Sequence, residues 1–230
     1  MFNPKLFVKN SNLFAKIRFI TETDNFGKTW QDKTTDWFLE NWNGNPLLNK
    51  NFLEWFSSKK DNVESILELG CGVGIYPIKH EELFRNKKYL GTDISKPAID
   101  YAEAHSNKEF ICGDFLKMNI EDKFDMIFAH GVIDCVYDVE LFLQKIINSC
   151  KKYAYISSCR GYHPNLLKHK MHWRDEEGCY YNDLSVSQLE KFLLDNGLSK
   201  EEFIIRPQES GASGITKIHA VIEINKKKNN

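Results

Sequence analysis

The segment SILELGCGVG, residues 65–74, contains an apolar run with one acid, followed directly by three glycines at alternate positions. The apolar run predicts a buried strand, and the glycines predict a tight turn where backbone can approach a ligand closely. Residues 75–84 place apolar side chains at helical spacing, with Pro77 in the first turn, where its missing N–H does no harm. Strand, glycine turn and helix N-terminus together predict a pocket for part of a nucleotide-like ligand.

The glycine spacing separates two kinds of nucleotide site. A dinucleotide fingerprint, G-x-G-x-x-G, would need its third glycine at the position of Ile75. The chain instead has an acid-x-G-x-G-x-G pattern, formed by Glu68, Gly70, Gly72 and Gly74. This pattern resembles motif I of the class I S-adenosylmethionine-dependent methyltransferases, a Rossmann-like family. The resemblance extends over residues 64–157.

Acids at the ends of the next predicted strands strengthen the resemblance. Asp93 closes the strand of residues 88–93 and lies 19 residues after Gly74, near the ~20-residue offset at which an acid meets ribose hydroxyls. Asp114 ends the next strand, and a fourth strand, within residues 123–133, ends at His130. Four strand ends at βα spacing therefore supply polar groups where such a cofactor needs them.

Membership of this family would imply the cofactor S-adenosylmethionine and the product S-adenosylhomocysteine. The acid that ends the second strand would bind the ribose diol, and the residue after it would pack on the adenine. The acid after the third strand would accept a hydrogen bond from the adenine amino group, and the loop after the fourth strand would lie beside the transferred methyl. A structural partner for Glu68 stays open as an alternative. The expected cofactor-binding residues are Glu68, Gly70, Cys71, Gly72, Gly74, Asp93, Ile94, Asp114, Phe115 and His130.

The predicted fold is α/β, with a Rossmann-like, mostly parallel seven-stranded sheet of order 3-2-1-4-5-7-6. Its last strand is antiparallel, helices cover both faces, and a helical extension precedes it. We expect one domain over residues 1–230, made of a helical cap (1–61), a cofactor-binding half (62–158), a substrate-facing insertion with the C-terminal strands (159–225) and a tail (226–230). Helices are expected near 34–42 and 47–56, after a cap at Ser95, and over 138–147 and 185–194 with caps at Asp138 and Ser185. The last two strands are expected at 202–206 and 217–225, joined through residues 211–214.

Composition is typical of a globular protein, with 42% hydrophobic and 27% charged residues. No window approaches the ~18 apolar residues of a membrane span, and the N-terminus lacks the apolar core of a signal peptide. The six cysteines form no C-x-x-C pair, which favours free thiols and a cytoplasmic setting. A net charge of −1 disfavours a nucleic-acid substrate, whose phosphates need a basic face.

The acceptor is expected to be a small molecule, such as a sugar or another polar metabolite. Residues 159–183 are predicted to be an irregular insertion after the fifth strand, at the sheet edge where ligands of open α/β folds bind. A substrate atom would attack the methyl in line, and an alcohol acceptor would need a base, for which histidine is suited. Candidate bases are His130, His163 and His169; candidate substrate-binding residues are Trp30, Arg160, Tyr162, Trp173 and Arg174.

Other interpretations stay open at this point. His163, His169, His172 and Cys179 have the residue types of a zinc site, but they form no paired ligand motif, so no metal is predicted. The fold could also serve a protein or nucleic-acid methyltransferase, an enzyme that transfers another group from a similar cofactor, or a non-catalytic binding module. The intact set of glycines and acids argues against the last of these. Oligomeric state cannot be predicted from these patterns.

Overall fold

The computed structural model describes residues 26–209 and 218–227. The sheet strands alternate with helices up to β5, except that a loop joins β3 to β4, and a hairpin and one further helix precede the last two strands. In chain order the elements are α2 (Lys28–Gln31), α3 (Thr35–Asn43), α4 (Pro46–Ser57), η1 (Lys60–Asn62), β1 (Ser65–Leu69), α5 (Ile75–Lys79), α6 (Glu81–Phe84), β2 (Lys88–Asp93), α7 (Lys96–His105), β3 (Glu109–Cys112), β4 (Phe124–His130), α8 (Val139–Ser149), β5 (Cys150–Ser158), β6 (Lys170–Arg174), β7 (Cys179–Asp183), α9 (Val186–Asp195), β8 (Phe203–Glu209) and β9 (Ile218–Asn225).

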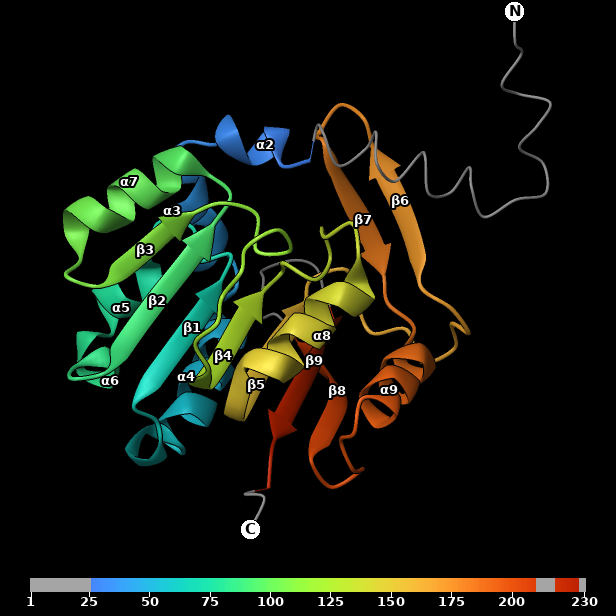
Figure 1. The fold of residues 1–230 in the computed structure, drawn as a ribbon. Helices are drawn as coiled ribbons and strands as arrows, with labels where there is room; N and C mark the ends of the chain where they lie inside the picture. The colour runs from blue at the N-terminus through green and yellow to red at the C-terminus, as the bar shows by residue number, and fades with distance from the viewer. Residues whose placement is uncertain (1–25, 210–217, 228–230) are drawn as a thin grey trace, which may run out of the picture.

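Seven strands form one sheet in the order β3-β2-β1-β4-β5-β9-β8 (Figure 1). The pairs from β3 to β5 are parallel, whereas β9 runs antiparallel to both β5 and β8. The predicted sheet order and the reversal of the last strand are therefore confirmed. Because β1, β2 and β4 are parallel neighbours, their carboxyl ends lie at one edge of the sheet, where ligands of open α/β folds bind.

Two apolar cores cover the two faces of the sheet. One contains Leu67 and Ile127 and includes apolar side chains of α8 and α9. The other contains Ile66 and Phe128 and includes side chains of α4, α5, α6 and α7. Residues adjacent in a strand alternate between these cores because successive side chains point to opposite faces. Helix α4, from the predicted cap, is therefore part of the second core.

Local capping explains where several predicted helices begin. Ser95 accepts a hydrogen bond from the N–H of Ala98, and Asp138 accepts one from Leu141. Ser185 does the same for Gln188 at the start of α9. Each satisfies a backbone donor that has no partner within its helix. The predicted helices near 34–42, 47–56, 138–147 and 185–194 are all present.

The predicted helix over residues 75–84 is broken into two short pieces. His80, with φ −125° and ψ 43°, leaves the helical region between α5 and α6. The break allows Leu83 and Phe84 to be buried in the second core, where the Phe84 ring meets that of Phe56 at 5.2 Å. Core packing therefore outweighs the helical periodicity of this segment.

The insertion after β5 is more ordered than expected, because it contains a two-stranded antiparallel hairpin of β6 and β7. Gly178, with φ +60°, lies at the end of the turn that joins them. Strand β6 exposes most of its residues and therefore lacks the alternation of apolar and polar side chains that identifies a half-buried strand. The prediction of an irregular segment was wrong for this reason.

Some predictions concern residues outside the described part. The glycine link at 211–214, the first 25 residues of the cap and the last three residues of the tail lie there. Among the helices of residues 26–209 and 218–227, none is long and apolar enough to cross a membrane. All six cysteines lie within these ranges and are free thiols.

Candidate active site

A cavity of about 560 Å³ opens at the carboxyl ends of β1, β2 and β4. Its walls come from the loops after these strands, from the loop after β5, and from the helices α2 to α5. Nine of the ten expected cofactor-binding residues line it: Glu68, Gly70, Cys71, Gly72, Asp93, Ile94, Asp114, Phe115 and His130. The tenth, Gly74, is the residue before α5 and lies behind the wall, packed beneath Ala102 and Phe110.

The glycine turn between β1 and α5 has a backbone that only glycine adopts readily. Gly70, Gly72 and Gly74 have φ angles of +68°, +52° and +67°. The turn also leaves no room for side chains: a Cβ on Gly70 would lie 2.3 Å from Cγ2 of Val132. A Cβ on Gly72 would lie 2.9 Å from the Phe38 ring. The glycines therefore permit both the turn and its close packing against the cavity walls.

Asp93 joins the glycine turn to the start of α7. One carboxylate oxygen accepts the N–H of Gly72 at 2.8 Å, and the other accepts that of Ser95 at 2.8 Å. Burial raises the pKa of Asp93, while these N–H groups oppose the rise. A carboxylate has about four lone-pair sites, so two remain for a ligand in the cavity. The position fits a sugar diol.

Glu68, near the end of β1, has a structural partner in addition to its place in the cavity wall. Tyr89 of β2 donates its hydroxyl hydrogen to one oxygen of the Glu68 carboxylate. Only 3% of the residue is exposed, and burial raises its pKa well above the ordinary value. The structure therefore bears out the alternative of a structural partner without removing Glu68 from the cavity.

Asp114 and Phe115 follow β3 and line the next part of the wall. One oxygen of Asp114 accepts the Leu116 N–H at 2.9 Å, and the other accepts the Tyr137 hydroxyl at 2.8 Å. Sequence reasoning did not identify Tyr137, because it lies in a loop after β4 with no local motif. Phe26 packs edge-on against the Tyr137 ring, with centroids 4.9 Å apart.

The short helix α2 spans the top of the site between α7 and the β6–β7 hairpin (Figure 1). Gly27 and Thr29 donate backbone hydrogen bonds to Gly178 and Glu177 in the hairpin turn. On the opposite side, the side-chain amide nitrogen of Gln31 donates to the carbonyl of Ile94, and its amide oxygen accepts the N–H of Lys96. Helix α2 thus connects two regions far apart in the sequence across the cavity.

His130 is the candidate base that lines the cavity. Its Nδ1 lies 2.9 Å from the Ser157 hydroxyl, and aromatic rings surround it, including Phe52 with centroids 4.7 Å apart and Tyr76 at 5.2 Å. Burial, assisted by the nearby His219, lowers the pKa of His130 to about 3. The imidazole is therefore neutral at physiological pH.

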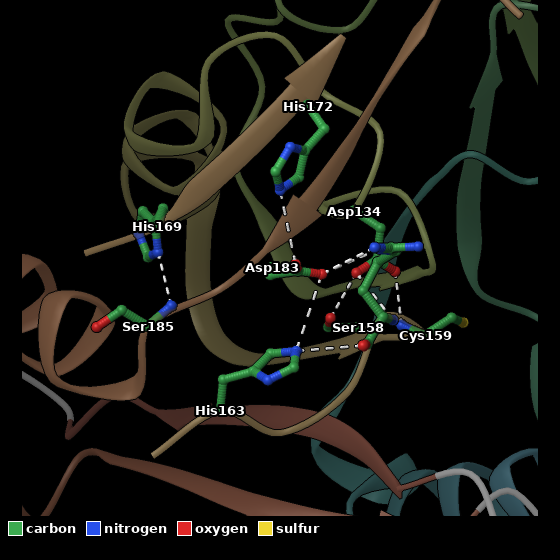
Figure 2. A network of polar contacts seen from close by, with 9 residues as sticks. Asp134, Ser158, Cys159, His163, His169, His172, Asp183 and Ser185 are labelled. Carbon is green, nitrogen blue, oxygen red and sulfur yellow. Dashed lines mark hydrogen bonds and ion pairs between the residues drawn. The ribbon is translucent and has the colours of Figure 1, made fainter. Parts of the chain in front are cut away.

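The other two candidate bases, His163 and His169, do not line the cavity; Figure 2 shows them near Asp183 and Ser185. His163 Nε2 is 3.2 Å from the Arg160 carbonyl and 3.9 Å from the Asp183 carboxylate. His169 Nδ1 accepts the N–H of Ser185, and burial lowers the pKa of His169 to about 4. Both histidines therefore have structural partners in the insertion.

Asp183 is the centre of the polar cluster in the insertion. Arg160 donates to one of its oxygens at 2.9 Å, and His163 and His172 lie on opposite sides of it (Figure 2). His169 lies apart beside Ser185, and Cys179 hydrogen-bonds with Cys135. The four residues considered for zinc are therefore not assembled, and no group able to hold a metal occurs among residues 26–209 and 218–227.

Of the five candidate substrate-binding residues, only Trp30 and Arg160 line the cavity. Tyr162, Trp173 and Arg174 lie elsewhere in the insertion: Arg174 packs on the Tyr181 ring, and Trp173 contacts the Tyr180 ring. Tyr181 does line the cavity, on the opposite strand of the hairpin. Without the hairpin register, the sequence could not show which of these aromatic residues faces the site.

Asp134, which sequence reasoning missed, is a buried carboxylate in the loop after β4. It accepts the Ser158 hydroxyl at 2.5 Å and the Cys159 N–H at 2.6 Å (Figure 2). Burial raises its pKa to about 6. Its position four residues after His130, in the same exit loop, is the signal that could have identified it.

Helices α3 to α5 close one side of the cavity with apolar and aromatic side chains. The cavity thus combines a largely aromatic wall with a line of strand-end acids and an open glycine turn. The acids suit the hydroxyl and amino groups of a nucleoside, and the apolar wall suits a displacement reaction that benefits from desolvation. These are the requirements of a nucleoside-bearing cofactor beside a small reacting centre.

Comparison with known proteins agrees with this chemistry. A family model described as a methyltransferase domain matches residues 60–204. A malonyl-[acyl-carrier protein] O-methyltransferase of Calditerrivibrio nitroreducens is 28% identical over 93 residues, which are 40% of this chain and 36% of that protein. The (S)-coclaurine N-methyltransferase of Papaver somniferum is 29% identical over 89 residues, 36% of this chain and 25% of that protein. The chain thus matches about a third or less of the length of these relatives.

Solved structures share the fold over most of the chain. The plantazolicin methyltransferase BamL, in complex with S-adenosylhomocysteine, has a TM-score of 0.60 at 15% identity, covering 93% of this chain and 99% of its own. Magnesium protoporphyrin IX methyltransferase from Synechocystis PCC 6803, with bound S-adenosylmethionine, has a TM-score of 0.56 at 16% identity, covering 99% of each chain. Motif, sheet order and family match agree: this chain belongs to the class I S-adenosylmethionine-dependent methyltransferase family.

Proposed function

We propose that this protein methylates a small-molecule acceptor and holds its cofactor with the glycine turn and the strand-end acids. The observation that carries the cofactor assignment is the double attachment of Asp93. Its two oxygens accept the N–H groups of Gly72 and Ser95, which fixes the carboxylate toward the cavity. A carboxylate held in this way is preorganised for the two hydroxyls of a ribose.

The other contacts follow the order of the strands. Ile94 supplies apolar surface for the adenine, Asp114 accepts a hydrogen bond from its amino group, and Phe115 offers a neighbouring backbone N–H. The glycine turn, with Cys71 between Gly70 and Gly72, approaches the sugar and the amino-acid part through its backbone. Glu68 contributes a buried carboxylate at the amino-acid end, where Tyr89 limits its freedom. Gly74 supports the turn from behind.

The cofactor supplies an activated methyl group, so the protein has mainly to align the acceptor and exclude water. The acceptor atom attacks the methyl carbon in line, and the departing sulfur keeps the electron pair of the broken bond. The aromatic side chains of α3 to α5 shield this centre from water. Among the three candidate histidines, His130 is the one in the cavity wall, and it is neutral, so it orients an acceptor by hydrogen bonding.

Two features support a small acceptor over a macromolecule. The aromatic wall and helix α2 close over the cavity from two sides, which suits a molecule that enters as a whole. The net charge of −1 provides no general attraction to nucleic acid. Screening metabolites for transfer of a labelled methyl group would identify the acceptor. Label recovered only in protein or nucleic acid would contradict a small-molecule acceptor.

The cofactor contacts are tested by calorimetric titration with S-adenosylhomocysteine. Asp93→Ala removes two charge-assisted contacts to the ribose, each of about 1.5–3 kcal/mol, and should weaken binding by at least about a hundredfold. Asp93→Asn, which keeps one acceptor oxygen, should show a smaller loss. Asp100→Ala serves as the matched control, because Asp100 is an exposed acid of α7 paired with Lys96.

Unfolding curves of the same variants separate a loss of contact from a loss of fold. If Asp93→Ala is folded and binds S-adenosylhomocysteine as tightly as Asp100→Ala does, the proposed ribose contact is wrong.

A further inference from the structure

One nitrogen of the cavity-lining His130 has a partner and the other does not. Nδ1 lies 2.9 Å from the Ser157 hydroxyl. Nε2 is buried and has no hydrogen-bond partner among the described residues. Buried polar atoms are almost always hydrogen-bonded, so such an atom in a cavity wall indicates a group that a ligand satisfies.

The surroundings of His130 restrict what that ligand can be. The rings of Phe52, Tyr76, Phe128 and Tyr155 lie with centroids 4.7–5.8 Å from the imidazole. An environment of this kind strongly disfavours a charge on the ring or next to it. The imidazole therefore offers one neutral hydrogen bond and cannot pair with an anion.

The nearby wall is largely aromatic, and its Trp42 and Tyr76 rings stand nearly perpendicular to each other. Phe38 of α3 lies against the glycine turn, and Trp42 packs on Tyr76 with centroids 6.2 Å apart. The Tyr76 hydroxyl is already used, because it donates to Asn49 at 2.9 Å. Aromatic side chains of this kind pack well against a planar molecule.

The charged groups on the opposite wall are satisfied within the protein. Arg160 is paired with Asp183 at 2.9 Å. Asp134 accepts the Ser158 hydroxyl and the Cys159 N–H. They therefore provide no free charge to balance an ionised acceptor. An uncharged acceptor on an aromatic wall differs from the sugar or other polar metabolite that the sequence led us to expect.

We infer that the methyl acceptor is a planar, uncharged molecule that packs against the aromatic side chains of Phe38, Trp42 and Tyr76 and hydrogen-bonds to His130 through the hydroxyl or amino group that is methylated. This inference rests on the proposed function. In the tautomer that donates from Nδ1 to Ser157, Nε2 accepts the acceptor's hydrogen. A lone pair of the acceptor oxygen or nitrogen then forms the bond to the methyl carbon, the carbon–sulfur pair stays on sulfur, and the acceptor's proton passes to water.

Binding of three probes to protein saturated with S-adenosylhomocysteine tests the inference by calorimetry. 2-Naphthol has the planar body and the hydroxyl, 2-methylnaphthalene lacks the hydroxyl, and 2-naphthoate carries a negative charge. We expect 2-naphthol to bind about tenfold more tightly than either of the others, as one buried hydrogen bond allows. Equal binding of 2-methylnaphthalene, tighter binding of 2-naphthoate, or no binding of any probe would overturn the inference.

Variants of His130 locate the hydrogen bond. His130→Phe keeps an aromatic ring among aromatic neighbours and should abolish the preference for 2-naphthol over 2-methylnaphthalene. His130→Gln, which restores a polar group near the position of Nε2, should recover part of it. His105→Phe, an exposed histidine at the end of α7 that stacks on Tyr101, is the control and should leave the preference unchanged.

The comparison of probes on the unaltered protein decides the matter if His130→Phe does not fold. A preference for 2-naphthol that persists in folded His130→Phe would also overturn the inference. Failure to bind S-adenosylhomocysteine in the first step would instead refute the proposed function. The two failures are therefore distinguishable.

Discussion

The sheet half of the molecule, residues 62–158, and the segments that cover it, residues 26–57 and 159–183, build the same cavity in different ways. In the sheet half, each functional group lies at the end of a strand, and its partners come from the adjacent turn or the neighbouring strand. In the covering segments, the important contacts join parts of the chain that are far apart in the sequence. Gly27 with Gly178, and Gln31 with Lys96, are examples. The polar groups of the sheet half therefore depend on local sequence, whereas the walls built by the covering segments depend on contacts between distant parts of the chain.

Helix α4 is the exception, because it belongs to a covering segment but packs as part of the core. Phe52 is fully buried and contacts Phe128 at 4.6 Å and Tyr155 at 5.2 Å between centroids. Phe52→Ala should lower the free energy of unfolding by about 3–5 kcal/mol, as removal of a buried aromatic ring does. Trp37→Ala in α3, whose ring is only partly buried, should have an effect below about 1 kcal/mol. Similar values for both in urea unfolding would show that α4 is not part of the core.

Asp134, in the loop after β4, binds Ser158 and Cys159, where the sheet half meets the insertion. This buried carboxyl should make the stability of the protein depend on pH. The folded protein holds the Asp134 proton more tightly than the unfolded chain, because burial raises the pKa from 3.8 to about 6. Stability should therefore fall as pH rises from about 4 to about 6. At about 1.4 kcal/mol for each pH unit, the total is about 3 kcal/mol.

Urea unfolding of Asp134→Asn and the unaltered protein between pH 4 and 7.5 measures this effect. The variant lacks the titrating carboxyl, so its stability relative to the unaltered protein should improve as the pH rises. The opposite slope from His130, whose pKa is lowered to about 3, is present in both proteins and cancels in the difference. A difference that is constant over this pH range would contradict a raised pKa of Asp134.

Two glycines test how strongly the cofactor turn depends on its packing. Gly70→Ala combines a left-handed backbone with a Cβ 2.3 Å from Val132, whereas Gly197→Ala has a similar φ of +87° and nothing within 4 Å. Gly197→Ala should cost about 1 kcal/mol of stability from the backbone alone. Gly70→Ala should cost about 2 kcal/mol and should also weaken binding of S-adenosylhomocysteine. Equal effects in thermal unfolding would mean that Val132 moves aside freely.

The smallest effect is expected in helix α2. Gln31→Ala removes exposed hydrogen bonds to Ile94 and Lys96 and should change the free energy of unfolding by less than about 1 kcal/mol. Because α2 crosses the cavity, the same change should speed release of S-adenosylhomocysteine a few-fold in stopped-flow measurements. An unchanged release rate would show that α2 does not retain the cofactor.

The predictions from sequence were most successful where a local pattern has a single structural meaning. The glycine turn, Asp93 and Asp114 were all predictable, because parallel strands bring their carboxyl ends to one edge. Helix caps at Ser95, Asp138 and Ser185 were equally local. Tyr137, Asp134 and Tyr181 were not predictable, since each enters the site through a loop or a hairpin register without a motif.

The candidate bases show the same limit. His163 and His169 were reasonable by residue type, but their hydrogen bonds to Arg160 and Ser185 occupy them within the insertion. His130 was predicted from its strand end, whereas its low pKa and its partnerless Nε2 depend on rings from α4, α5 and β5. The sequence alone cannot show such a neighbourhood.

The sequence by itself determined the sheet and the edge of the sheet at which the glycine turn and the strand-end acids meet, and the resemblance of its motif pointed to the family. The sheet and its edge follow from strand periodicity, glycine conformation and the spacing of acids, which act over a few residues. Only the tertiary structure decided which aromatic residues face the cavity, that β6 and β7 pair, and that Asp183 gathers the insertion's charges. Those outcomes depend on the packing of segments distant in the chain, where burial and shape outweigh local preference.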